Sequence, residues 1–183
     1  MDANTRAADA VTEASATTPH RSPRSDAVRN RERLLDAAMA AFAARGVEVP
    51  LEEIARSAGV GIGTLYRHFP TRDALIEAAY RHEVGVLAQA ATDLLAAMPA
   101  DEALGRWMQL FVGHVALKRG MASALRSMIG PENRLFEDSR ALILAAASDL
   151  LAAAVASGTV RSDVQARDLV QAIGGVCMSV DQA

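Results

Sequence analysis

Cysteines and aromatic residues are scarce in this chain of 183 residues, which has one Cys, one Trp and 4% aromatic side chains. A single cysteine excludes an intramolecular disulfide framework and a zinc site built from several cysteines. The thiol of Cys177 has the apolar neighbours Val176, Met178 and Val180, which is typical of a packed cysteine and not of a redox sensor.

Long apolar runs are also missing. The longest stretch without a charged residue is the twelve-residue segment Leu169 to Val180, shorter than the roughly 18 apolar residues that cross a bilayer. Residues 1–19 carry Asp2, Asp9 and Glu13 and have no apolar core, unlike a secretory signal. We therefore expect a cytoplasmic protein without a membrane partner.

Signatures of catalysis are lacking as well. The pair His82-Glu83 is followed by Val86 where a zinc-protease helix needs a second His. The sequence has no Glu-x-x-His pair, no G-x-S-x-G turn, no phosphate-binding Walker loop and no dinucleotide fingerprint. We expect no enzyme activity, no metal and no organic cofactor.

What is present favours helices throughout, because 51% of the residues are apolar, Ala and Leu are abundant, and β-branched residues are few. The fold class expected is all-α, with an N-terminal three-helix head joined by a long helix to a C-terminal helical bundle. The predicted parts are a disordered tail over 1–24, a head over 25–70 and a bundle over 71–183.

The helix boundaries follow from capping and breaking residues. Helices are predicted over 25–45, ending at Gly46; over 50–58, with Pro50 at its first position; over 62–69; and over 71–98, capped by Thr71. In the bundle we predict helices over 101–118, 121–129 and 133–156. Ser162 and Gln165 form a capping-box pattern that predicts the start of the last helix.

Charge is distributed unevenly along the chain. Residues 20–72 hold nine Arg and six acidic residues, a net charge of +3, whereas residues 73–183 have a net charge of −4 within a total of −3. A basic segment attached to an acidic body is consistent with a nucleic-acid-binding module, although such asymmetry is also common on ordinary surfaces.

Two short helices joined by a Gly-containing turn fit the sequence description of a helix-turn-helix. The stretch that carries them, LEEIARSAGVGIGTLYRHFPTRDAL over residues 51–75, closely resembles the signature of the TetR family of bacterial transcriptional regulators. The resemblance is strong over residues 28–80 and extends to the remainder only in layout. It implies double-stranded DNA as a partner, a homodimer, and a C-terminal domain for ligand binding and dimerisation.

The residue types at the matched positions suit DNA. Gly63 has no Cβ to keep a phosphate from the first N–H groups of the third helix, and Tyr66 and His68 offer hydrogen-bonding groups two residues apart. Arg67 can read a guanine or neutralise a phosphate. The predicted DNA-binding residues are Ile62, Gly63, Thr64, Tyr66, Arg67, His68, Thr71 and Arg72.

The sequence departs from the family pattern at two places. Gly61 stands where the family commonly has Ser or Thr, and Val49-Pro50 stands where it commonly has a Thr cap. Arg29, Arg31 and Arg33 on the first helix are interleaved with acidic residues, which favours a solvated helix face over DNA contact.

The bundle has an excess of Met and a helix with two apolar faces, features that suit both a plain core and an adaptable pocket. A small apolar effector is predicted to bind among Trp107, Phe111, His114, Met121, Leu125, Met128 and Phe136. The short segment 121–129 between Gly120 and Gly130 is expected to shift. The long helix over 71–98 is expected to link this pocket, near Met98, to the DNA-reading head.

A homodimer is predicted on the last helix, whose Leu169, Ile173, Val176 and Val180 lie beside the small residues Ala172, Gly174 and Gly175. The function predicted is a ligand-responsive transcriptional regulator that represses from a palindromic operator. Two alternatives stay open: a helical ligand-binding or interaction protein without operator specificity, and a small helical enzyme that uses His114.

Overall fold

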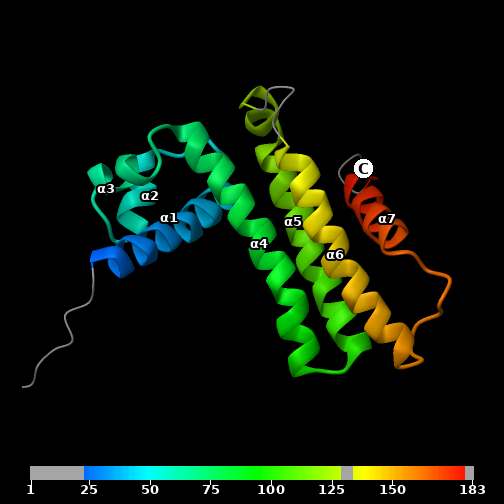
Figure 1. The fold of residues 1–183 in the computed structure, drawn as a ribbon. Helices are drawn as coiled ribbons and strands as arrows, with labels where there is room; N and C mark the ends of the chain where they lie inside the picture. The colour runs from blue at the N-terminus through cyan, green and yellow to red at the C-terminus, as the bar shows by residue number, and fades with distance from the viewer. Residues whose placement is uncertain (1–22, 129–133, 180–183) are drawn as a thin grey trace, which may run out of the picture.

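The computed structural model describes residues 23–128 and 134–179, which form helices without any strand (Figure 1). The predicted all-α fold is confirmed. The helices are α1 (Pro23–Arg45), α2 (Leu51–Ser57), α3 (Ile62–His68), α4 (Arg72–Ala97), α5 (Ala100–Met128), α6 (Leu135–Ala156) and α7 (Ala166–Ser179). Of the predicted tail over 1–24, residues 1–22 lie outside the described residues, and residues 23 and 24 already belong to α1.

The head consists of α1, α2 and α3, gathered on one side of α4 (Figure 1). The buried face of α1 is the one its periodicity predicts, with Leu34, Leu35, Ala38 and Phe42 almost inaccessible to solvent. Gly59 lies in the turn between α2 and α3 with φ at +67°, a left-handed conformation that glycine adopts without steric cost. The turn thereby sets the direction in which α3 leaves α2.

The body is built from α4, α5 and α6, and α7 packs against α5 and α6. Two sequence expectations are wrong here. The helix does not break at Gly120, since α5 runs unbroken from Ala100 to Met128; a single helical glycine costs only about 1 kcal/mol relative to alanine. The helix also does not start at Ser162, because Asp163 pairs with Arg161 in the preceding turn and α7 begins at Ala166.

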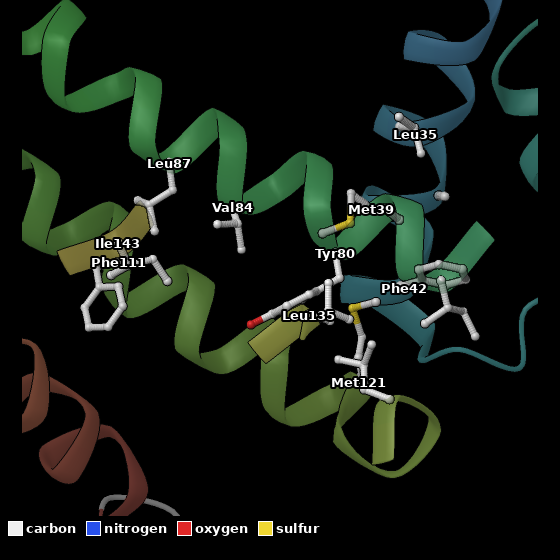
Figure 2. Packing of buried hydrophobic residues seen from close by; sticks show 14 of the residues in the cluster. Leu35, Met39, Phe42, Tyr80, Val84, Leu87, Phe111, Met121, Leu135 and Ile143 are labelled. Carbon is white, nitrogen blue, oxygen red and sulfur yellow. The ribbon is translucent and has the colours of Figure 1, made fainter. Parts of the chain in front are cut away.

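Head and body share one continuous core. Figure 2 shows Met39 and Phe42 of α1 near Tyr80 of α4, Met121 of α5 and Leu135 of α6. Each of these side chains is at most 7% exposed, and α1 contacts both α4 and α5. We call these five residues the junction core; they couple the position of the head to the packing of α4, α5 and α6.

Among the described helices, α6 alone is long and apolar enough for its length and hydropathy to suit a membrane-crossing segment. In this fold it is a packed helix of the body, with Ala147, Leu150 and Ala154 fully buried. Core helices of soluble bundles commonly have this composition. Its outward side remains apolar, with Leu142 50% exposed.

Candidate nucleic-acid interface and effector cavity

The third helix presents an exposed surface at the edge of the head. Tyr66 is 46% exposed and Arg67 is exposed beside it, whereas Leu65 and Phe69 point into the core. A Cβ added at Gly63 would meet no atom within 4 Å. The packing of the chain therefore does not require glycine at this position, and the small residue leaves the surface accessible to a backbone from another molecule.

The other predicted residues of α3 are less accessible. Ile62 is half-buried against the core, and Thr64 and His68 are also half-buried. Gly61, the N-cap residue, provides no side-chain hydrogen bond to the helix. The exposed part of the predicted contact set therefore centres on Gly63, Tyr66 and Arg67.

Thr71 and Arg72 have structural partners at the start of α4. The Thr71 hydroxyl accepts a hydrogen bond from the Ala74 N–H at 3.0 Å, which confirms the predicted cap. Arg72 donates from one terminal nitrogen, Nη1, to the carbonyl oxygens of Val47 and Val49, at 2.6 and 2.8 Å. Arg72 therefore holds the loop between α1 and α2 against α4, a role that sequence reasoning missed because the partners lie more than 20 residues away.

A cavity of about 470 Å³ lies among α5, α6 and α7, and Tyr80 of α4 also lines it. This volume is within the range of small-molecule sites. Of the predicted effector residues, Phe111, His114 and Phe136 line the cavity. Trp107, Met121 and Leu125 do not line it: they are fully buried in the core, and the Trp107 indole donates to the Leu87 carbonyl oxygen at 2.9 Å. The side chain of Met128 lies outside the described part of the structure.

His114 is the least ordinary residue of the cavity wall. It is only 2% exposed, and its Nδ1 has no hydrogen-bond partner among the described residues. Burial, together with the charge of Lys118, lowers the pKa of His114 from 6.5 to about 4, so the imidazole is neutral at neutral pH. Its ring stacks near Phe111 and Tyr80, at centroid distances of 6.0 and 5.8 Å.

Tyr80 joins the cavity to the junction core. Its ring extends from α4 toward the α5 and α6 side in Figure 2. Burial raises the pKa of this phenol, so Tyr80 stays neutral. The expectation that α4 reaches the pocket near Met98 is therefore wrong. The α4 residue that lines the cavity is Tyr80, which lies in the half of α4 nearer the head, where α5, α6 and α7 enclose the cavity.

Four basic residues line the same cavity: Lys118, Arg119, Arg140 and Arg167. The Lys118 ammonium lies 5.0 Å from the centre of the Phe136 ring, and Arg119 donates to the Cys177 carbonyl oxygen at 2.6 Å. Sequence reasoning missed these cations. Spacing offered a signal for two of them, since Lys118 and Arg140 each follow a predicted pocket residue, His114 and Phe136, by four positions on one helix.

A helix-turn-helix head with an exposed third helix, joined by a long helix to an all-helical body that contains a cavity, defines a class of DNA-binding transcriptional regulators. Residues 34–79 match the family described as bacterial regulatory proteins, tetR family, and residues 99–183 match the SbtR-like transcriptional regulator C-terminal domain. The chain belongs to the TetR family. The prediction that it is not an enzyme is confirmed, since its relatives are transcriptional regulators.

Two solved structures resemble most of the chain. A TetR transcriptional regulator from Streptomyces coelicolor is 46% identical, with 81% of this chain and 85% of that chain covered and a TM-score of 0.76. A TetR transcription regulatory protein from Mycobacterium vanbaalenii is 40% identical, with 87% and 96% covered and a TM-score of 0.75.

The similarity to a curated relative covers a short stretch of both chains. An HTH-type transcriptional regulator of Staphylococcus aureus is 43% identical over 53 residues, which are 28% of this chain and 29% of that protein. The chain thus matches less than a third of this relative's length.

Proposed function

We propose that this chain is a cytoplasmic, ligand-responsive repressor that binds a palindromic operator as a homodimer. The observation that carries the proposal is the exposed surface of α3, where Tyr66 and Arg67 flank the open position of Gly63. Hydroxyl and guanidinium groups on a helix that fits the major groove supply phosphate contacts and one base-reading group. His68, half-buried at the end of α3, adds a third polar contact.

The dimer is proposed on the outward sides of α6 and α7. Leu142 of α6 and Val176 of α7 are 50% and 63% exposed, and Ala141 and Ala145 beside Leu142 are not buried either. Of the predicted α7 residues, Leu169 and Ile173 are half-buried against their own core, and Val180 lies outside the described residues. Apolar residues exposed together on neighbouring helices favour association with a second copy.

The operator is found by selection from a random duplex library, and affinity is then measured by fluorescence anisotropy at several salt concentrations. A dimer is expected to select two inverted half-sites with centres about 34 Å apart, one turn of DNA. The triple variant Tyr66→Ala, Arg67→Ala, His68→Ala should lose specific binding. Arg106→Ala, an exposed change on α5 far along the chain from α3, is the control and should keep it.

The single variants separate the roles. Tyr66→Phe and His68→Ala should weaken binding to all sequences, whereas Arg67→Ala should also relax the base preference at one position of each half-site. Equal operator affinity of the wild type and the triple variant would refute the proposed interface. A folded wild type that selects no sequence at all would favour a ligand-binding protein without operator specificity.

A further inference from the structure

The cavity wall combines apolar side chains with several basic ones. Tyr80, Phe111, Phe136 and Ile143 contribute apolar surface. Lys118, Arg119, Arg140 and Arg167 contribute positive charge, and among the described residues that line the cavity there is no Asp or Glu. Asp168, next to Arg167, lines a neighbouring hollow instead.

The positive charge of the cavity wall contrasts with the net negative charge of the body. Residues 73–183 have four more acidic than basic side chains, yet four of the nine basic residues of this region line one cavity. In the described part of the chain, Lys118, Arg140 and Arg167 form no ion pair with a carboxylate. Three basic side chains at one apolar cavity, without a carboxylate partner among the described residues, favour an anionic ligand.

The electrostatics of the pair Lys118 and Arg140 agree with this reading. Burial and the nearby Arg140 charge lower the pKa of Lys118, so the two cations repel each other across the cavity wall. An anion between them would relieve the repulsion. His114, also in the cavity lining, adds a buried Nδ1 that has no hydrogen-bond partner among the described residues.

We propose that the cavity binds an amphiphilic carboxylate, whose apolar chain lies among Phe111, Phe136 and Ile143 and whose carboxylate is bound by Lys118, Arg140 and Arg167. This replaces the expected purely apolar effector with an acid. This inference rests on the proposed function in one respect, that the ligand is the effector that controls operator binding. Binding itself is independent of DNA.

The experiment titrates the DNA-free protein with three probes that share one alkyl chain: decanoate, decanol and decylammonium. Trp107, the single tryptophan, stacks on Phe111 at 5.6 Å, so its fluorescence reports on the cavity. Decanoate should bind at least about tenfold more tightly than either of the other probes, as expected for one well-placed charge-assisted contact.

Arg140→Gln should remove most of the preference for decanoate over decanol, because the exposed Arg140 lines the cavity without an ion pair among the described residues. Arg106→Gln, the same change at an exposed position of α5 outside the cavity, should keep the preference. Absence of decanoate binding, equal or tighter binding of decanol or decylammonium, or an unchanged preference in Arg140→Gln would overturn the inference.

A separate titration adds decanoate to the protein bound to its selected operator. Release of DNA at decanoate concentrations that saturate the cavity supports both the ligand class and its role as effector. Charge-selective binding without any change in operator affinity would keep the ligand assignment and refute ligand response as part of the proposed function.

Discussion

Replacing His114 by Phe should stabilise the protein, and increasingly so as the pH falls. Phe keeps the ring that stacks near Phe111 and Tyr80, removes the unpartnered Nδ1, and has the adjoining cavity to accommodate its larger ring. A buried polar group without a partner costs about 1–3 kcal/mol. At pH 7.5 the imidazole is neutral in both the folded and the unfolded protein. Removal of the unpartnered Nδ1 is then the only gain in stability that we expect.

Acidification adds a second contribution to the difference in stability between His114→Phe and the wild type. The unfolded chain binds a proton on His114 near pH 6.5, whereas the folded protein binds it only near pH 4. Between these values the unfolded state binds more protons, so the free energy of unfolding falls as the pH falls. Linkage gives a loss of about 2.5 kcal/mol at pH 4.5 relative to pH 7.5, from a shift of roughly 2.5 pKa units. The variant His114→Phe has no imidazole to protonate at this position, so it does not show this loss of stability.

The assay is urea unfolding of both proteins, followed by circular dichroism at pH 7.5, 6.0, 5.0 and 4.5. Other titrating groups act on both proteins and cancel in the difference between the two free energies of unfolding. This difference should grow from pH 7.5 to pH 4.5, and Lys118→Met, which removes the nearby charge, should reduce the acid loss of the wild-type imidazole. Parallel pH profiles, or a variant less stable than the wild type at pH 7.5, would refute the reasoning.

Three further changes test the fold. Gly59→Ala should lower the free energy of unfolding by about 1–2 kcal/mol because φ is +67° there; unchanged urea midpoints would contradict the assigned turn. Thr71→Ala should cost about 1 kcal/mol through loss of the bond from the Ala74 N–H, and Thr71→Ser should restore most of it in the same assay. Trp107→Phe removes the indole hydrogen bond to the Leu87 carbonyl and should lower the thermal midpoint, with a cost of about 0.5–1.5 kcal/mol; an unchanged midpoint would argue against this bond.

Local signals in the sequence were sufficient to predict most of the helices. Gly46 and Gly59 both adopt positive φ where a helix ends, and Thr71 caps α4, because capping depends on neighbours in sequence. The same logic failed where tertiary packing outweighs a local preference. α5 continues through Gly120 because its Met121 and Leu125 are fully buried in the core, which stabilises the helix on both sides of the glycine.

In the candidate sites, too, some features follow from local sequence and others depend on tertiary packing. The exposed position of Tyr66 follows from the burial of Leu65 and Phe69 on a short helix, which periodicity can predict. The Arg72 bonds to the loop before α2, and the presence of both Lys118 and Arg167 in one cavity wall, depend on how distant helices pack. Trp107 was assigned to a pocket because it is large and apolar, but sequence cannot tell whether its indole N–H has a carbonyl partner within the core.

Tyr80 lines the cavity, and Arg72 binds the loop between α1 and α2 of the head; both residues belong to α4. Eight residues of helix separate them, about 12 Å of stiff backbone without a loop. In a two-fold symmetric dimer a displacement of about 1 Å at each cavity, moving both heads apart, changes the distance between the two α3 helices by about 2 Å. Under the proposed function, the half-sites of the operator lie about 34 Å apart. Two-fold symmetry would then double a displacement of about 1 Å at each cavity into a mismatch of about 2 Å between the α3 helices and the operator.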